Sequence, residues 1–404
     1  KKFFMRAKRG VNMNVTGIIA EYNPLHNGHF YHIQQTRKVC NAKILIAVMS
    51  GNFVQRGEPA IVSKWERTKM ALHAGIDLVL ELPFLFATQN AERFSDAAVC
   101  ILKYMQAQNL VFGSESGELT PLKRIAKILL HSDQAHFKQE RSIGYARQME
   151  NTLLNTPELI PYIKHPNHIL GIQYIRSILA QNAKILPITI QRKGSSYHHS
   201  EIVNTGFSSA TAIRKLLFEE RKVTSKIQTA VPEMTAKILN QVENYIDWNT
   251  LFPYLQIKVA TNSANCLKQH LLVHEGIENR IKKIIPYETD FYDCMKRLKT
   301  KRYTWTRLMR TLLHITLSTH KKWESFSYTN IPYIKILGFN DNGRSYVKQM
   351  KKICPVPLIS LPKETIHPLI DLEEKADIAY ALLHHNLNRR TYLLKRRLQG
   401  PVLY

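Results

Sequence analysis

Short apolar runs alternate with amphipathic stretches through residues 15–220, and this alternation constrains the fold more than any other feature of the chain. The runs have the length of strands and are hydrophobic almost throughout, which is typical of strands buried on both faces. We expect strands at residues 15–22, 42–50, 77–82, 110–113 and 184–191. The intervals have helical spacing, and one helix begins with a capping box, Ser63-Lys-Trp-Glu66. The pattern predicts an α/β fold, a doubly wound parallel sheet of Rossmann-like type.

The chain beyond about residue 220 has a different pattern. It shows mostly helical spacing, with one small strand–helix–strand element expected between residues 333 and 360. We therefore predict three parts, which are a basic N-terminal extension (1–12), an α/β domain (13–220) and a mostly helical, basic domain (221–404).

The charge balance favours a polyanionic partner. Lys and Arg number 57 against 31 Asp and Glu, a formal net charge of +26. Such an excess favours nucleic acid, an anionic membrane or polyphosphate over a basic macromolecule. Paired basic residues recur in the helical half, at Lys301, Arg302, Lys321, Lys322, Lys351, Lys352, Arg389, Arg390, Lys395, Arg396 and Arg397.

Hydropathy and cysteine usage point to the cytoplasm. No apolar run approaches the ~18–20 residues that a membrane span needs, and the first twelve residues lack the apolar core of a signal peptide. The five cysteines are odd in number and widely scattered, without a Cys-x-x-Cys pair. We expect a protein of the reducing cytoplasm with no membrane segment.

The segment Glu21-Tyr-Asn-Pro-Leu-His26-Asn-Gly-His29 directly follows the first predicted strand. This position is the carboxyl end of a strand and the start of a helix, where α/β folds bind ligands. Gly28 lets a phosphate approach the backbone, and two imidazoles can donate hydrogen bonds to its oxygens. Two surface histidines beside a turn, or a metal pair, are the other interpretations. No acidic or cysteine ligand stands at a spacing that fits a metal.

The His-x-Gly-His element resembles the signature of the HIGH-motif nucleotidyltransferases, which attack the α-phosphate of ATP and release pyrophosphate. Their second signature is a Ser/Thr-rich helix start that ends in Arg, and residues 207–214 (FSSATAIR) resemble it. Ser209 and Thr211 offer hydroxyls at a helix start, and Arg214 can clamp phosphates one turn further in. A plain helix cap with an exposed Arg would also explain this segment.

Several segments together resemble the bacterial tRNA(Met) cytidine acetate ligase family. They run in order through most of residues 15–220, at 17–29, 49–60, 77–83, 112–115, 166–171 and 207–214, with a weaker match at 337–343. The resemblance implies an ATP-dependent ligase that activates acetate as acetyl-adenylate. The acetyl group then passes to N4 of the wobble cytidine of elongator tRNA(Met), giving N4-acetylcytidine, and the basic half would hold the tRNA.

The same resemblance implies site residues. Catalysis would use His26 and His29 at the α-phosphate, with Ser209, Thr211 and Arg214 near the departing pyrophosphate. The ATP site would comprise Gly17, Ile18, Ile19, Ala20, Glu21, Tyr22, Asn23, Pro24, Leu25, His26, Asn27, Gly28, His29, Phe30, Gly113, Asn167, Arg192 and Lys193. Mg²⁺ is expected only as the counterion of ATP, without a dedicated metal site. The chain departs from the family at His168, where the family commonly has a second asparagine.

Two other functions stay open at the level of sequence. The first is a small-molecule adenylyltransferase of the nicotinate- or pantetheine-phosphate type, which the superfamily signature alone does not separate from a ligase. The charge of +26 and the long helical half argue against it. The second is a non-catalytic RNA-binding protein, and the intact His26, Gly28, His29 and Arg214 argue against that.

Overall fold

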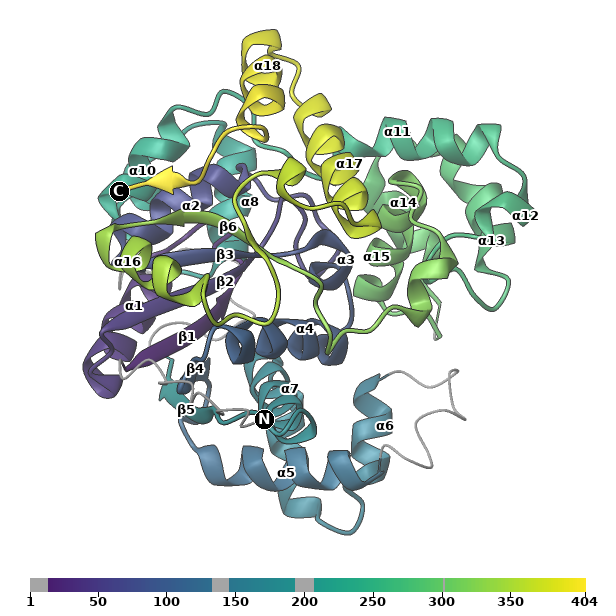
Figure 1. The fold of residues 1–404 in the computed structure, drawn as a ribbon. Coiled ribbons are helices and arrows are strands. Elements are labelled where there is room, and N and C mark those ends of the chain that lie inside the picture. The colour runs from purple at the N-terminus through teal and green to yellow at the C-terminus, as the bar shows by residue number, and fades with distance from the viewer. Residues whose placement is uncertain (1–13, 133–144, 193–206, 301) are drawn as a thin grey trace, which may run out of the picture.

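The computed structural model describes residues 14–132, 145–192, 207–300 and 302–404. Within this part of the chain, eight strands form one sheet in the order β5-β4-β1-β2-β3-β6-β7, with β8 paired to β6 (Figure 1). The strands are β1 (Val15–Ala20), β2 (Ile44–Ser50), β3 (Leu78–Leu82), β4 (Asn109–Ser114), β5 (Leu186–Gln191), β6 (Ile334–Phe339), β7 (Leu358–Ile359) and β8 (Val402–Leu403). All five strands that the sequence predicts in residues 15–220 are present and mutually parallel, which confirms the predicted fold class.

The helices follow the strands in the order that a doubly wound fold requires. In the N-terminal half they are α1 (Asn27–Cys40), α2 (Lys64–His73), α3 (Phe84–Ala87), α4 (Ala91–Tyr104), α5 (Leu119–Ser132), α6 (Tyr145–Thr152), α7 (Pro166–Ala180) and α8 (Ala210–Glu220). Beyond them lie α9 (Ser225–Ala230), α10 (Glu233–Asn240), α11 (Trp248–Thr261), α12 (Ala264–Leu267), α13 (Ile277–Ile284), α14 (Phe291–Leu298), α15 (Trp305–Thr316), α16 (Asp341–Met350), α17 (Pro368–Leu382) and α18 (Leu387–Arg396). Helices α11 to α15 gather on one side of the sheet, to the right in Figure 1. Among the described residues, no helix combines the length and apolar character needed to cross a bilayer.

Local sequence signals fix several helix ends. The Ser63 hydroxyl accepts the backbone N–H of Glu66, and the Glu66 carboxylate accepts the N–H of Ser63 at 2.9 Å. The predicted capping box is therefore present at the start of α2. Gly75 follows the helix with φ of +102°, a conformation that glycine adopts without strain.

The strand–helix–strand element expected at 333–360 is part of the main sheet. Strand β6 pairs antiparallel with β3, with Val79 opposite Gly338. A Cβ at Gly338 would lie 2.6 Å from the Thr68 side chain and 2.8 Å from the Val402 carbonyl, so only glycine fits between α2 and β8. Strands from beyond residue 220 thus extend the sheet, and one hydrophobic core runs from the sheet into the helical half. The predicted division of the chain at residue 220 stays a prediction.

Candidate functional site

A cavity of about 470 Å³ opens at the carboxyl ends of β1, β4 and β5. This is the edge at which parallel α/β sheets bind ligands. Most of the predicted site residues line it, namely Ile18, Ile19, Ala20, Glu21, Tyr22, Asn23, His26, Gly28, His29, Gly113, Asn167, Arg192, Ser209, Thr211 and Arg214. The fold therefore brings the two predicted signatures, which are 180 residues apart in the chain, to one cavity.

His26 and His29 form a stacked pair at the N-terminus of α1. Their ring centroids are 3.7 Å apart with an interplanar angle of 24°. His26 caps the helix because its Nδ1 accepts the N–H groups of Gly28 at 3.0 Å and His29 at 3.4 Å. The Nδ1 of His29 accepts the N–H of His26 in return, also at 3.4 Å. A Cβ on Gly28 would lie 2.8 Å from the His26 ring, so glycine is needed for this cap.

The hydrogen bonds and burial define the protonation of both rings. Since each Nδ1 accepts a hydrogen bond, the neutral ring carries its proton on Nε2. Burial, together with the positive charges of Arg192 and Arg214, lowers the pKa of His26 to about 3. Burial and the neighbouring His26 also hold the pKa of His29 well below its usual range. At neutral pH the pair therefore offers two Nε2–H hydrogen-bond donors rather than two cations.

The second signature forms the start of α8. Ser209 caps this helix, with its Oγ accepting a backbone N–H at 3.1 Å. Arg214 lies one turn inward, where its guanidinium donates to the Asn23 carbonyl at 2.9 Å and lies 3.6 Å from the Glu58 carboxylate. Arg214 thus joins α8 to the turn between β1 and α1. A helix N-terminus with a nearby guanidinium is a favourable place for phosphate.

Asn167 and Arg192 meet on the opposite wall. The Asn167 amide donates to the Glu115 carboxylate at 2.7 Å, and its oxygen accepts a hydrogen bond from Arg192 at 3.4 Å. Gly113 packs against Arg192, and a Cβ at Gly113 would lie 3.3 Å from the Arg192 side chain. These residues come from the ends of β4, β5 and α7, so they close the cavity on the β5 side.

His168, the departure from the family pattern, does not line the cavity. Its side chain is buried, its Nε2 accepts the N–H of Ser116 at 3.0 Å, and its Nδ1 lies 3.1 Å from the Tyr162 carbonyl. The Nδ1 therefore carries the proton and donates to that carbonyl. His168 ties the first turn of α7 to two backbone segments, and this is a structural role.

A few of the predicted nucleotide-binding residues do not line the cavity. The residues that do not line it are Gly17, Pro24, Leu25, Asn27 and Phe30, and Lys193 lies outside the described residues. Gly17 packs against Leu102, whose side chain would be 2.5 Å from a Cβ at this position. The Asn27 amide donates to the Thr229 carbonyl at 2.8 Å. Their assignment to the ATP site stays a prediction. In the structure, Gly17 allows β1 to pack closely against α4, and Asn27 joins the start of α1 to α9.

Further residues line the cavity that were not predicted from the sequence. Phe112 and Tyr174 stack edge-to-face at 5.9 Å, and both line it. Phe112 could have been found because it directly precedes Gly113, and Tyr174 lies two helical turns after Asn167 on α7. Thr306, in the first turn of α15, also lines the cavity, and no local sequence signal indicates it.

The segment 52–60 completes the cavity next to β1, where Val54, Gln55, Arg56 and Glu58 line it. It is fastened by the helical half of the chain, whose side chains donate to three of its carbonyls. Trp248 donates to the Gly57 carbonyl at 2.8 Å, Arg310 to Gln55 at 3.3 Å, and Tyr380 to Ala60 at 2.8 Å. Within the segment, the Gln55 N–H donates to the Glu21 carboxylate at 2.7 Å.

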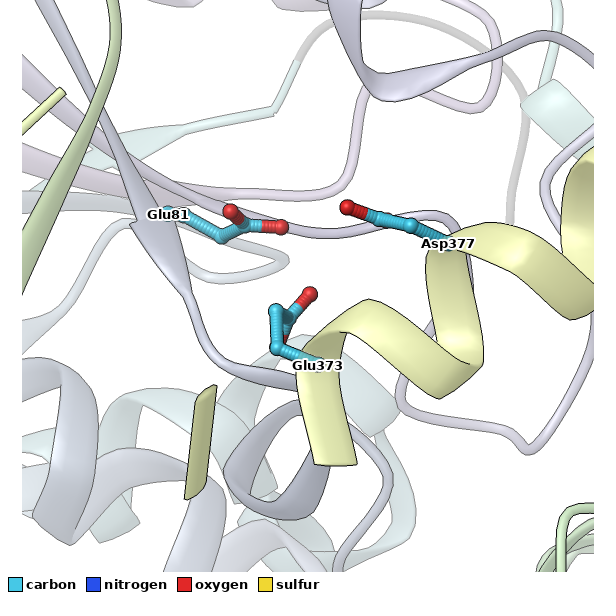
Figure 2. A group of neighbouring side chains, drawn as sticks. All are labelled: Glu81, Glu373 and Asp377. Atoms are coloured by element: carbon cyan, nitrogen blue, oxygen red, sulfur yellow. The ribbon is translucent and has the colours of Figure 1, made fainter. Parts of the chain in front are cut away.

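A buried charge cluster lies behind this segment and was not predicted. Lys64 Nζ lies 2.5 Å from Glu81, 2.6 Å from Asp377 and 3.4 Å from Glu373, and all four side chains are buried. Figure 2 shows Glu81 on β3 and the other two carboxylates on α17 pointing toward one another. Lys335 on β6 adds a second cation, 3.2 Å from Glu81.

The three carboxylates of this cluster are close enough to hold a metal ion, but their charge is already compensated within the protein. Two lysines face Glu81 and Asp377, and burial with the charge of Glu81 raises the pKa of Glu373 well above its usual range, which favours the neutral form of this third carboxyl. The amide of Asn52 donates to Asp377 at 2.9 Å and so links the cluster to the start of the cavity segment. The cluster fastens α17 to the sheet.

The paired basic residues predicted in the helical half differ in exposure, and Lys321 and Arg390 are half-buried. Three arginines of α18 and its end are engaged within the protein, since Arg389 contacts Glu66, Arg396 donates to the Gly400 carbonyl at 2.7 Å, and Arg397 contacts Glu374. Exposed side chains belong to Arg302, Lys322, Lys351, Lys352 and Lys395, while Lys301 lies outside the described residues. Of the predicted paired residues, the exposed ones are available to a polyanion.

Comparison with known proteins identifies the family of this chain. A family described as HIGH Nucleotidyl Transferase matches residues 13–393. The tRNA(Met) cytidine acetate ligases of Geobacillus sp. and Oceanobacillus iheyensis are each 40% identical to this chain, over 97% of it and 100% of their own length. Thermotoga maritima TmcAL, in a crystal structure with alpha-thio ATP, is 30% identical and superposes with a TM-score of 0.87, covering 97% of this chain and 99% of that one. This chain therefore belongs to the tRNA(Met) cytidine acetate ligase family of HIGH nucleotidyl transferases.

Proposed function

We propose that this protein is an ATP-dependent tRNA(Met) cytidine acetate ligase. It joins acetate to ATP to give acetyl-adenylate and pyrophosphate, and then transfers the acetyl group to N4 of the wobble cytidine of elongator tRNA(Met). The observation that carries the proposal is the cavity in which His26 and His29 face the same space as Ser209, Thr211 and Arg214. Relatives that bear this name match the chain over nearly its whole length.

The first step uses the hydrogen-bond donors of the cavity. An acetate oxygen attacks the α-phosphate, and the bond from that phosphorus to the bridging oxygen of pyrophosphate breaks. The Nε2–H groups of His26 and His29 stabilise the charge that develops on the phosphate oxygens, a contribution of electrostatic preorganisation. Arg214 and the start of α8 receive the departing pyrophosphate. Gly113, Asn167 and Arg192 surround the nucleoside on the opposite wall.

Magnesium belongs to this proposal only as the counterion of ATP. In the part of the chain that the structure describes, the one carboxylate cluster suited to a metal is that of Glu81, Glu373 and Asp377, where Lys64 lies among the carboxylates. None of these residues lines the cavity. The ion would therefore be held by the phosphates of ATP, and no protein ligand is assigned to it.

The acceptor in this proposal is a tRNA. A net charge of +26 supports a polyanionic partner, and phosphate contacts require many cations with little sequence precision. The exposed cations Arg302, Lys322, Lys351, Lys352 and Lys395 would supply such contacts. The wobble base would be unstacked from its loop to reach the cavity, as is common in RNA recognition. A cytoplasmic location is part of the same proposal.

The deciding experiment is nucleoside mass spectrometry. Bulk tRNA from a bacterial strain that lacks acetylcytidine is incubated with the protein, ATP, Mg²⁺ and acetate. A cytidine heavier by one acetyl group, formed only with both ATP and acetate, is the expected result. If protein that binds ATP forms no modified nucleoside, the proposal is wrong. Pyrophosphate release that needs neither tRNA nor acetate would then indicate a small-molecule adenylyltransferase.

A further inference from the structure

Glu21 belongs to the ATP site that the family resemblance implies, but the adenylation step proposed above gives its carboxylate no chemical role. It follows β1 directly, and its half-buried side chain lines the same space as His26 and His29. One carboxylate oxygen accepts the Gln55 N–H at 2.7 Å. Among the described residues, no hydrogen-bond donor reaches its second oxygen. The side chain is thus held at one oxygen while the other stays available to a group in the cavity.

Acetyl transfer has a chemical need that none of the other assigned residues meets. The exocyclic N4 of cytidine bears two hydrogens, and one of them must leave as the new N–C bond forms. The two histidines are poor acceptors for it, because their Nδ1 atoms already accept backbone N–H groups and their Nε2 atoms carry protons. Arg192 and Arg214 are cations. A carboxylate at hydrogen-bond reach of the amine is a suitable general base.

We propose that Glu21 accepts the N4 proton during acetyl transfer, a role that rests on the proposed function above. The cytidine N4 attacks the carbonyl carbon of acetyl-adenylate, and the N–C bond forms. The bond from the carbonyl carbon to the phosphate oxygen breaks, and AMP leaves with that electron pair. The N4 proton passes to the free oxygen of Glu21, and no other reactant is needed.

The surroundings of Glu21 suit a proton acceptor. Burial raises its pKa above the usual range, against the lowering effects of the Gln55 N–H, Arg56 and Arg214, while Glu58 raises it. The neighbouring groups that face it from other elements are Arg67 on α2 and Tyr174 on α7. A raised pKa makes the carboxylate a stronger base, and efficient general bases have a pKa that approaches the working pH.

The test separates the two half-reactions in the variant Glu21→Gln. Glutamine has the same shape, and its oxygen can still accept the Gln55 N–H, so the segment 52–60 keeps its contact. Acetate-dependent exchange of pyrophosphate into ATP reports adenylate formation. Single-turnover transfer from preformed acetyl-adenylate to tRNA reports the second step. We expect exchange to stay within a few-fold of wild type while transfer falls by about 10²–10⁴-fold, the usual contribution of a general base.

A pH profile distinguishes proton transfer from a positioning effect. Wild-type transfer should rise with pH through the raised pKa of Glu21, and Glu21→Gln should lose this rise. Glu58→Gln is the comparison variant, because Glu58 lines the same cavity but pairs with Arg214. This variant should keep the rise, displaced to lower pH because the charge of Glu58 raises the pKa of Glu21. Unchanged transfer in Glu21→Gln, or equal losses of exchange and transfer, would overturn the role. Absence of acetate-dependent exchange and transfer in the wild type would instead overturn the proposed function.

Discussion

Replacing Lys64 by methionine tests whether the buried charge cluster holds the two halves of the protein together. Lys64 is fully buried and contacts carboxylates on β3 and α17, 17 and 313 residues away in the chain. Methionine keeps most of the volume but removes the cation. Glu81 and Asp377 would then share only Lys335, at 3.2 and 3.7 Å.

The expected loss in free energy of unfolding follows from the burial of the Glu81 and Asp377 carboxylates. Removing one partner of a buried ion pair leaves an uncompensated charge and destabilises by about 3–5 kcal/mol. At a urea m-value of about 3 kcal/mol/M, this loss lowers the unfolding midpoint by at least about 1 M. Replacing Asp377 by leucine in the same chain removes one of the orphaned carboxylates, so the double variant should recover part of the loss. Lys69→Met, an exposed change on the same helix, should stay within about 0.5 kcal/mol.

The pH dependence supplies the refuting result. Burial alone would raise the pKa of Glu81, but Lys335 and Lys64 outweigh it and hold this pKa at about 2, below the usual 4.5. The stabilisation from Glu81 is therefore complete above pH 4.5 and is lost as the pH falls toward 2. Urea unfolding is followed by tryptophan fluorescence at several pH values. The difference in free energy of unfolding between wild type and Lys64→Met should become smaller across this range. If this difference is below about 1 kcal/mol at pH 7, or does not change on acidification, the charge cluster does not stabilise the protein in this way.

Three further predictions concern the cavity. His29→Ala should reduce acetate-dependent pyrophosphate exchange by about 10²–10³-fold through loss of one donor, while gel-shift assays show unchanged tRNA binding. His168→Asn should leave the Kd for ATP within about two-fold of wild type, because the His168 ring contacts backbone groups of Ser116 and Tyr162 outside the cavity. A large loss of ATP affinity, measured by calorimetry, would contradict this. Gly57→Ala should lower the free energy of unfolding in urea by about 1–3 kcal/mol. Gly57 has φ of +81°, and a Cβ there would lie 2.6 Å from the Arg310 backbone. Gly400→Ala is the control, because a Cβ at Gly400 has no atom within 4 Å and should leave stability unchanged.

The parts of the fold set by local pattern could be predicted from the sequence. The five parallel strands were predictable because buried strands are short apolar runs, and the start of α2 was predictable because Ser63 and Glu66 stand three residues apart. The His26–His29 cavity was predictable for a related reason. The ends of parallel strands meet at one edge, so signatures that follow β1 and β5 come together there.

Features that depend on distant partners could not be predicted. The antiparallel pairing of β6 with β3 needs knowledge of which sheet edge is free. The local sequence suggests that Lys64 lies on a solvent-exposed face of its helix, because its partner Asp377 is 313 residues away. The sequence likewise suggests that the arginines of α18 form an exposed basic surface, although Arg396 and Arg397 have partners within the fold. Charge in a sequence does not reveal whether it is already paired.

The segment 52–60 shows why the cavity needs the whole chain. A buried loop has carbonyls that no strand pairs, and each needs a donor from elsewhere. Trp248, Arg310 and Tyr380 supply three of these donors from positions 191, 255 and 320 residues further along the chain. The same segment places the Gln55 N–H against Glu21, so the helical half determines the position of a carboxylate in the cavity. The helical half therefore contributes to the geometry of the candidate active site as well as to the basic surface proposed for tRNA.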